Sequence, residues 1–488
     1  MKYLFFFLAL VSLQSMGAQN AEFDRALYKA YSEFEEPSIQ KRRIHHSDIQ
    51  PLIAELRNDS KYTVKKVGSS IEGRDLHLIS LGSGATNVFL WSQMHGDEPT
   101  ATQAIFDIFN FFDSDQFSEE KEKMLSELTL HFLPMLNPDG AEVFQRRNRL
   151  GVDINRDALR LQSPESRTLK RVRDSLDADV GFNLHDQSRY YNTPLSEKPA
   201  TISYLAPAYN YEKDINDVRG RAMKLIVMMN NSIQKFAPGQ VGRYDDAFEP
   251  RAFGDNIQKW GTSTILIESG GYPGDVEKQE IRKLNFMSVL MACHAIATKS
   301  YESVSIEDYE QIPPNDRKLY DLKLVGLNYK LLGETYKIDL GIHHLEIDND
   351  SHSDFYNKGQ IVDMGDLSTF YGYETLDADG YTIVEGKTYP DVLGTLKDVS
   401  KLKPVELLKS GYLYVKLKNL PDGINDVKLP INILSEGRRQ PGLYVGIGGN
   451  PNFLLEKEGK FHFAVVNGFL IDLSQNTADI PNAMIYKN

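Results

Sequence analysis

Cysteine is almost absent from this sequence, since Cys293 carries the one thiol among 488 residues. A lone cysteine excludes an intramolecular disulfide, so the stability of the fold has to come from the size of its core. Cys293 lies in a strongly apolar segment of helical character, residues 286–297. A buried and inert thiol is expected there rather than a nucleophile.

Basic residues are fewer than acidic residues. The chain has 55 Lys and Arg against 68 Asp and Glu, which leaves a formal net charge of −13. Non-specific binding to nucleic acid needs a basic surface that neutralises phosphates, so no nucleic-acid partner is expected. Hydrophobic residues make up 41% and charged residues 25%, which is typical of a globular protein and excludes a disordered or collagen-like chain.

A run of about 20 apolar residues, which a membrane-spanning helix needs, is missing. The apolar stretch Tyr3–Leu13 is shorter; one basic residue precedes it, and the small residues Ser15, Gly17 and Ala18 follow it. This pattern is typical of a signal peptide, which we predict over residues 1–18. We therefore expect export to a periplasmic or extracellular compartment, and no transmembrane segment in the mature chain.

Short apolar runs alternate with longer helical patterns between residues 65 and 312. Buried strands are predicted at residues 87–91, 129–136, 179–185, 201–206 and 263–268. Helical periodicity is present over residues 99–112, 163–176, 214–236 and 278–297. This alternation predicts an α/β domain with a mostly parallel or mixed sheet and helices on both faces. Residues 19–64 are expected to be an N-terminal extension packed on this domain.

The remainder of the chain has a different character, with short β-like runs and many turn signals. We expect a boundary near Ile312–Asp316, and a β-rich C-terminal domain of unknown role over residues 315–488. Residues 359–386 and 452–472 resemble the paired β-sandwich segments that flank the barrel in amidohydrolases. Because the barrel and its His-x-His metal pair are missing, the resemblance implies a small β-sandwich without activity of its own.

Polar motifs stand at the carboxyl ends of two predicted strands, where open α/β sheets build their sites. His95 and Glu98 follow the strand at residues 87–91, and His185 ends the strand at residues 179–185. Each motif alone is compatible with a surface loop or a core histidine. Together, two imidazoles and one carboxylate are the ligands of a catalytic zinc ion that keeps a fourth position for water. We therefore expect one Zn²⁺ per chain.

Two further carboxylates are candidates for the same site. Asp153 could orient a ligand imidazole by accepting its other ring proton, or it could be an ordinary turn residue. Glu268 ends a buried strand, where a charge is costly unless it serves a site. A carboxylate there can take a proton from a water that zinc acidifies and pass it to the leaving amine.

The motifs HGDE, LNPDG, RRNRLGVDINR, NLHDQ and ILIESG occur in this order between about residues 70 and 300. This ordered set closely resembles the zinc carboxypeptidases of the carboxypeptidase A and B type. The resemblance implies the same zinc ligands, His95, Glu98 and His185. The implied partner is a peptide substrate with a free C-terminal carboxylate.

The resemblance also implies a role for each matching residue. Glu268 is the general base and acid. Arg146 polarises the scissile carbonyl and stabilises the oxyanion, while Asn155 and Arg156 grip the terminal carboxylate of the substrate. A guanidinium forks onto a carboxylate in a bidentate pair, which selects chain ends over internal bonds.

The family usually carries a tyrosine on a mobile loop about twenty residues before the base, and here the sequence departs from the pattern. Tyr244 is the nearest tyrosine, whereas counting back from the base leads to Asp246 or Ala247. Arg251 is a candidate for a positively charged lid in place of the tyrosine. Asp255 is a candidate for lining the pocket of the terminal side chain.

Two other functions stay open. An amide hydrolase of the aspartoacylase and succinylglutamate desuccinylase type shares the metal set but acts on small acylated amino acids, and the NPDG and R-x-N motifs favour the peptidase over it. A zinc-free pseudoenzyme could bind peptide or glycan ends through its arginines. Every catalytic position holds a competent residue, which disfavours this reading.

Overall fold

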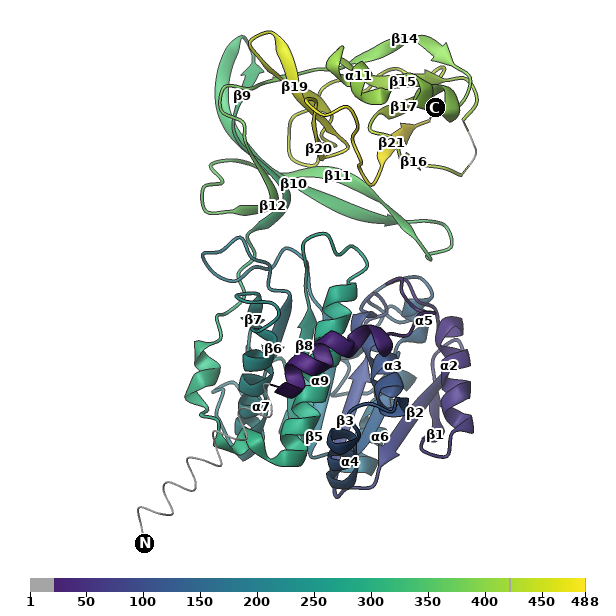
Figure 1. Cartoon of the computed structure of the whole chain (residues 1–488), viewed down its shortest axis with the longest axis vertical. Helices are drawn as coiled ribbons and strands as arrows, with labels where there is room; N and C mark the ends of the chain where they lie inside the picture. The colour runs from purple at the N-terminus through teal and green to yellow at the C-terminus, as the bar shows by residue number, and fades with distance from the viewer. Residues whose placement is uncertain (1–21, 421–422, 488) are drawn as a thin grey trace. The chain divides into compact units, whose positions relative to one another are not determined.

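The computed structural model describes residues 22–420 and 423–487, and the chain divides into two compact units after Arg317. This division lies next to the expected boundary at Ile312–Asp316. Each unit has its own sheets (Figure 1). Each also has its own clusters of buried apolar side chains.

The first unit is built on an eight-stranded sheet in the order β1-β2-β4-β3-β5-β8-β6-β7 (Figure 1). The neighbours β4, β3, β5 and β8 run parallel, whereas β2 and β6 join them antiparallel on either side. The expected α/β fold with a mostly parallel or mixed sheet is confirmed. The strands are β1 (Thr63–Ser69), β2 (Asp75–Gly82), β3 (Thr86–Ser92), β4 (Leu128–Leu133), β5 (Val180–Asp186), β6 (Ile202–Leu205), β7 (Val241–Arg243) and β8 (Ser263–Ser269).

Helices cover both faces of this sheet. Successive side chains of a strand point to opposite faces, so the apolar side chains of one strand contribute to two clusters. Val88 and Leu90 of β3 pack in one apolar cluster with α3, α7 and α9, while Phe89 and Trp91 pack in another with α6 and α8. The helices predicted from periodicity are confirmed as α3, α6, α7 and α9. Cys293 is buried in α9, and burial raises the pKa of its thiol to about 12.

The helices of this unit have the following bounds: α2 (His46–Asn58), α3 (Thr100–Asp113), α4 (Ser118–Glu127), α5 (Pro138–Ala141), α6 (Pro164–Leu176), α7 (Asp217–Ile233), α8 (Phe253–Lys259) and α9 (Gln279–Thr298). Short 3₁₀ helices lie at η1 (Tyr31–Glu33), η2 (Ile154–Arg156), η3 (Ser300–Ser303) and η4 (Glu307–Gln311).

Residues 22–62 contribute to the core of the first unit. Phe23 is buried in the same apolar cluster as α3 and α9. Arg282 of α9 and Asp107 of α3 form an ion pair in which both side chains are 0% exposed. The Arg282 guanidinium also donates to the carbonyl oxygen of Glu36 at 3.1 Å. This segment is therefore tied to two helices that are distant in the sequence.

The second unit holds two sheets, one in the order β11-β10-β9-β13-β18-β19-β20 with β12 paired to β9, and one in the order β14-β15-β17-β21-β16. Its β-rich character is confirmed, but it differs from a simple β-sandwich. The strands β14, β15, β17 and β21 pair in parallel, and parallel neighbours need a crossover connection. The helices α10 and α11 supply that connection between β14 and β15, and they share a core with β19.

The elements of the second unit are β9 (Leu319–Leu331), β10 (Glu334–Asp348), β11 (Phe355–Gly365), β12 (Tyr371–Asp377), β13 (Thr382–Val384), β14 (Lys387–Leu393), α10 (Leu396–Lys401), α11 (Pro404–Lys409), β15 (Tyr412–Leu417), β16 (Asp426–Val427), β17 (Asn432–Ser435), β18 (Phe453–Lys457), β19 (Lys460–Val466), β20 (Phe469–Asp472) and β21 (Ala483–Tyr486).

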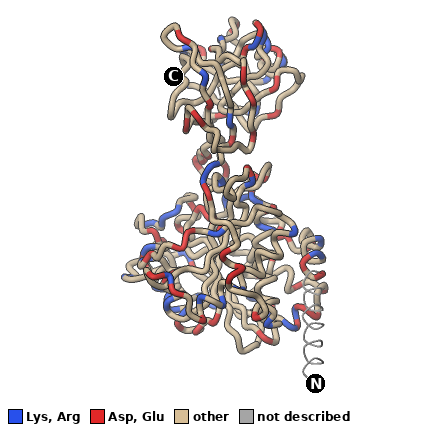
Figure 2. The backbone as a smooth tube through the Cα atoms, turned by 90° about the vertical axis from the view of Figure 1, so that its left-hand side faces the viewer, with Lys and Arg blue, Asp and Glu red and all other residues tan. Residues whose placement is uncertain are grey.

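Charged residues of both signs are interspersed along the two units (Figure 2). Among the described residues, the helices are too short or too polar to cross a membrane. The signal peptide predicted over residues 1–18 lies outside the described residues.

Candidate active site

The fold brings residues from separate motifs to one edge of the sheet, at the carboxyl ends of β3, β5 and β8. The turn after β3 carries His95 and Glu98. His185 of β5 pairs directly with Glu268 of β8, so their side chains leave the sheet side by side. Open α/β sheets form their binding sites at this edge.

Three of these side chains direct their donor atoms at one point. Nδ1 of His95 and Nδ1 of His185 lie 3.2 Å apart, and each is 2.7 Å from a different carboxylate oxygen of Glu98. A tetrahedral zinc ion with Zn–N bonds of about 2.0–2.1 Å holds two nitrogens roughly 3.3–3.4 Å apart. All three residues are buried. The donor set and its spacing therefore fit zinc.

The charges of this cluster compensate one another. Burial alone raises the pKa of the Glu98 carboxyl, but His95 and His185 outweigh burial and the pKa is lowered. Burial lowers the pKa of His95, but Glu98 and Asp153 together raise it to about 9. Burial is the main cause of the lowered pKa of His185. Glu98 is therefore ionised, which is the form of a carboxylate that binds a metal.

Glu268 stands beside this cluster and is 7% exposed. Burial raises the pKa of its carboxyl well above the ordinary value, and the negative charge of Glu98 raises it further. His95 and Arg146 act in the opposite sense. A carboxylate with a raised pKa is a stronger base, which suits proton transfer near neutral pH.

Asp153 connects the cluster to Arg146. Its Oδ1 lies 3.1 Å from Nε2 of His95, and its Oδ2 accepts a hydrogen bond from Nε of Arg146 at 3.0 Å. When Nε2 carries the ring proton, Nδ1 of His95 directs a lone pair at Glu98 and His185. Nη1 of Arg146 lies 3.1 Å from that same Nδ1, so the guanidinium reaches the point on which the cluster converges.

The LNPDG motif holds the arginine loop against the turn that carries His95. The Asn137 side chain accepts from the backbone N–H of Gly140 at 3.0 Å and donates to the carbonyl oxygen of Arg146 at 3.2 Å. A Cβ on Gly96 would stand 2.1 Å from the carbonyl carbon of Gly140. Because the two backbones touch, the HGDE and NPDG motifs form one structural unit.

Asn155 and Arg156 belong to η2 and line the same cavity as the cluster. Nε of Arg156 lies 3.5 Å from the carboxylate of Glu249. Glu249 is held in turn by two hydrogen bonds from Arg251, at 3.1 and 3.0 Å. A carboxylate thus already stands beside the Arg156 guanidinium, the kind of group that the sequence predicts for it.

Tyr244 and Asp255 line the cavity, whereas Arg251 is not among its lining residues. Burial is the main cause of the raised pKa of the Tyr244 hydroxyl, followed by the charge of Glu268. Burial also raises the pKa of Asp255 to about 7, and this carboxyl accepts from the backbone N–H of Glu249. The Arg251 side chain is 58% exposed and forms an ion pair with Glu249, so its role as a lid stays a prediction.

The cavity itself has a volume of about 180 Å³. Every predicted site residue except Arg251 and Asp153 lines it. Leu205, Pro207 and Leu266 are among its other lining residues, so the charged groups face a partly apolar enclosure. Such an enclosure strengthens electrostatic interactions relative to water.

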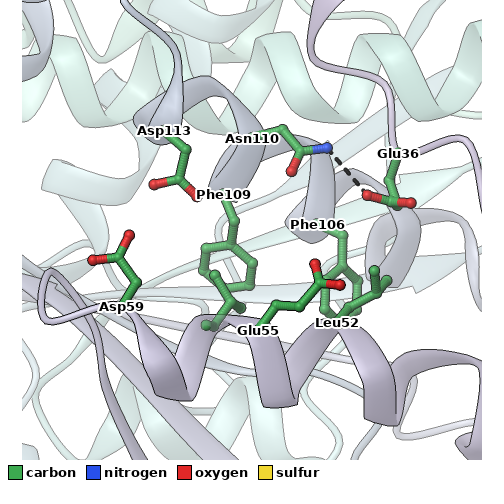
Figure 3. Close-up of a pocket in the computed structure, with 9 residues that line it drawn as sticks. Glu36, Leu52, Glu55, Asp59, Phe106, Phe109, Asn110 and Asp113 are labelled. Atoms are coloured by element: carbon green, nitrogen blue, oxygen red, sulfur yellow. Dashed lines mark hydrogen bonds between the residues drawn. The ribbon is translucent and has the colours of Figure 1, made fainter.

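A separate hollow of about 240 Å³ lies between α2 and α3. Phe106 and Phe109 of α3 line it together with the carboxylates of Glu55, Asp59 and Asp113 (Figure 3). Its lining contains no histidine and no arginine. It therefore offers neither the expected zinc ligands nor a clamp for a carboxylate.

Comparison with known proteins shows which family this part of the chain resembles. Residues 51–224 match the family model described as zinc carboxypeptidase. This part of the first unit is therefore similar to the zinc carboxypeptidase family. The match includes the cluster and the arginine loop and ends before Glu268. Glu268 is thus brought to the site by the register of β5 and β8, independently of the match.

Curated relatives are similar over short segments. Carboxypeptidase SOL1 of Arabidopsis thaliana is 26% identical over 145 residues, which cover 26% of this chain and 30% of that protein. Carboxypeptidase E of Caenorhabditis elegans is 30% identical over 116 residues, which cover 20% of this chain and 25% of that protein. The aligned segments thus span less than a third of either relative.

Solved structures that resemble the chain include a metallo-carboxypeptidase from Burkholderia cenocepacia, with 16% identity, a TM-score of 0.43, and coverage of 52% of this chain and 69% of that chain. Carboxypeptidase A from Helicoverpa armigera has 15% identity and a TM-score of 0.43, covering 58% of this chain and 80% of that chain.

Glu249 and Asp186 also line the cavity, but they were not predicted from the sequence. The Asp186 carboxylate accepts hydrogen bonds from Thr100 at 2.6 Å and from Lys278 at 2.9 Å, and its backbone N–H donates to Glu98 at 3.2 Å. The sequence signal that could have identified Asp186 is its position, because it is a charged residue at the end of a buried strand. Glu249 left no such signal, because its partner Arg156 is distant in the sequence.

Proposed function

We propose that this chain is a zinc-dependent carboxypeptidase that hydrolyses the C-terminal peptide bond of peptides. The convergence of His95, Glu98 and His185, with donor atoms 2.7 to 3.2 Å apart, carries the proposal. Two imidazoles and one carboxylate suit a catalytic zinc site with an open position. The family match supports the same metal.

A zinc ion held by these three residues would supply Lewis acidity, which lowers the pKa of a water molecule and polarises the scissile carbonyl. Glu268 takes a proton from the attacking water and returns it to the leaving nitrogen. Arg146 donates hydrogen bonds to the carbonyl oxygen as negative charge develops there. Asp153 holds both the His95 ring and the Arg146 guanidinium in place.

Specificity for chain ends comes from Asn155 and Arg156 in this proposal. A desolvated guanidinium binds a carboxylate more strongly than it binds a neutral amide, because both hydrogen bonds are assisted by charge. A substrate carboxylate at Arg156 displaces the weak contact of 3.5 Å with Glu249, which Arg251 retains. Asp255 lines the part of the cavity that receives the terminal side chain.

The test compares N-acetylated peptides that end in a free carboxylate or in an amide, with release of the terminal residue as the readout. We expect the free-carboxylate peptides to be cleaved and the amides to be poor substrates. Glu268→Gln should lower kcat by at least about 10²-fold, while zinc content and inhibitor affinity stay near wild type. Glu122→Gln, at an exposed position, is the matched control.

Equal cleavage of free and amidated peptides would overturn the exopeptidase assignment. A Glu268→Gln variant that keeps more than about a tenth of the wild-type kcat would show that Glu268 is not the base. The second candidate, an amide hydrolase for small acylated amino acids, predicts turnover of N-acetyl aspartate and none of blocked dipeptides.

We also propose that residues 1–18 direct export of the chain and are removed. The support is the apolar run behind a single basic residue. N-terminal sequencing of the protein from an extracytoplasmic fraction tests this, and a start near Ala18 or Gln19 is the expected result.

A further inference from the structure

A second cavity adjoins the catalytic one in the first unit. Its volume is about 490 Å³, and Tyr244 and Asp245 line both cavities. Tyr191 and Asn315 belong to the second cavity alone. Tyr244 and Asp245 therefore form a border that the two cavities share.

The far wall of this second cavity is fixed by hydrogen bonds. Asn315 is bound through its backbone N–H to the carbonyl oxygen of Arg243 at 2.8 Å. Its side chain donates to Gln187 at 2.8 Å and accepts from Ser203 at 2.9 Å. Ser203 lies in β6 and pairs with Glu268 in β8. The wall is thus joined to the sheet that carries the catalytic residues, so it is preorganised for binding.

The direction of a bound peptide follows from which residues line which cavity. Asn155, Arg156 and Asp255 line the catalytic cavity only, whereas Tyr244 and Asp245 border both. In this arrangement, a peptide whose C-terminal carboxylate is held at Arg156 can extend toward the second cavity along Tyr244 and Asp245. The residues on the amino side of the scissile bond then enter the second cavity.

We propose that this second cavity, bordered by Tyr191 and Asp245, binds the two or three residues upstream of the scissile bond and favours a cationic side chain among them. The proposal rests on the proposed function and deepens it, because it makes extended peptides, rather than blocked dipeptides or acylated amino acids, the preferred substrates.

The aromatic part of the cavity supplies the contact surface. The rings of Tyr191 and Tyr244 have centroids 6.1 Å apart and an interplanar angle of 66°, so an edge of one ring faces the other. Tyrosines offer large contact areas with little conformational freedom to lose, which suits them to binding peptides.

The charge preference comes from Asp245. Arg243 is paired with Glu310 at 2.7 Å, and Asp246 is paired with Lys213 at 2.6 Å, so both are compensated. The Asp245 carboxylate accepts from the backbone N–H of Ala247 at 3.0 Å, and no ion pair to it is found within the described ranges. An uncompensated carboxylate at the border of a cavity attracts a cation.

The first test compares N-acetylated peptides of two, three and four residues that share the same two C-terminal residues. For the wild type, kcat/KM should rise about tenfold from two to four residues, because the added residues bury surface on Tyr191. In Tyr191→Ala this rise should be lost. Tyr336→Ala, which removes a 49% exposed tyrosine of the second unit, should keep it.

The second test varies the upstream residue of the tetrapeptide between Lys, Ala and Glu. The wild type should prefer Lys to Glu by about two- to fivefold at low salt, as expected for a solvated charge pair, and the preference should fade at high salt. Asp245→Asn should abolish it. Asp308→Asn, at an exposed position away from both cavities, is the control that should keep it.

Equal kcat/KM for blocked dipeptides and tetrapeptides in the wild type would overturn the proposal, as would an equal loss on both in Tyr191→Ala. A wild type that is indifferent to Lys and Glu would refute the role of Asp245. These results leave the carboxypeptidase assignment standing, since they require that peptides are cleaved. If none of the peptides is hydrolysed, the proposed function fails first.

Discussion

The carboxylate of Asp153 touches two groups of the site at once, which makes Asp153→Asn an informative substitution. Oδ1 stands 3.1 Å from Nε2 of His95, and Oδ2 stands 3.0 Å from Nε of Arg146. An asparagine keeps one acceptor oxygen, but its amide nitrogen replaces the other oxygen and places a donor against the N–H group of His95 or Arg146. It also removes the negative charge that stabilises the proton on Nε2.

Loss of a carboxylate partner behind a metal-binding histidine typically weakens metal binding 10- to 100-fold. We expect a change of that size here, equal to about 1.4–2.7 kcal/mol, because Asp153 is only 8% exposed and water replaces the lost contact poorly. The zinc dissociation constant is measured by competition with a chromophoric chelator, at a pH where both proteins are folded.

Asp115→Asn, at an exposed position, is the matched control and should leave zinc affinity unchanged. With zinc in excess, kcat/KM of Asp153→Asn should still be reduced, because Arg146 has lost its partner. An affinity within twofold of wild type would refute the reasoning, since Asp153 would then be an ordinary turn residue.

Three further predictions concern other parts of the first unit. Arg156→Ala should raise KM for free-carboxylate peptides by roughly 30-fold in steady-state kinetics. This is the low end of the effect of removing one partner of a charge pair, because the Arg156 side chain is 37% exposed. An unchanged KM would contradict the proposed binding of the terminal carboxylate by Arg156. Arg282→Met leaves the Asp107 carboxylate buried and unpaired, so urea unfolding should show a loss of about 3–5 kcal/mol, which the double variant with Asp107→Leu should largely restore. Burial raises the pKa of Asp255 to about 7. In the unfolded chain the pKa of this carboxyl is about 3.9. The contribution of protonated Asp255 to folding stability is therefore complete below pH ~4 and is lost as the pH rises to about 7. Asp255→Asn should flatten the fall of Tm over this pH range, and an unaltered slope would contradict the prediction.

The central elements of the first unit could be predicted because they carry local signals. The strands β3, β5 and β8 are continuous apolar runs, as expected for strands buried on both faces. The helices α3, α6, α7 and α9 repeat apolar residues with helical periodicity. The edge strands β1 and β7 were missed, since β1 is partly exposed and β7 has three residues, so their pattern is weaker. The strand β2, which lies between β1 and β4, was missed as well, although most of its residues are buried.

The candidate site was predictable for a related reason. His185 and Glu268 each end a buried run, and the position of a polar residue at the end of a parallel strand is itself a local signal. Contacts between residues distant in the sequence carry no such signal, as in the ion pair of Arg156 with Glu249. Arg251, two residues from Glu249, also pairs with that carboxylate, and its role as a lid stays a prediction.

The candidate zinc ligands can be recognised in the sequence alone, because ligand chemistry depends on residue type and on the strand ends that carry them. Tertiary packing sets the distance of 3.2 Å between Nδ1 of His95 and Nδ1 of His185. It also brings Arg282 and Asp107 together inside the core and places Asn315 in the wall of the second cavity. Each of these contacts joins segments separated by many residues. Their geometry depends on how the helices and strands pack, which no local pattern encodes.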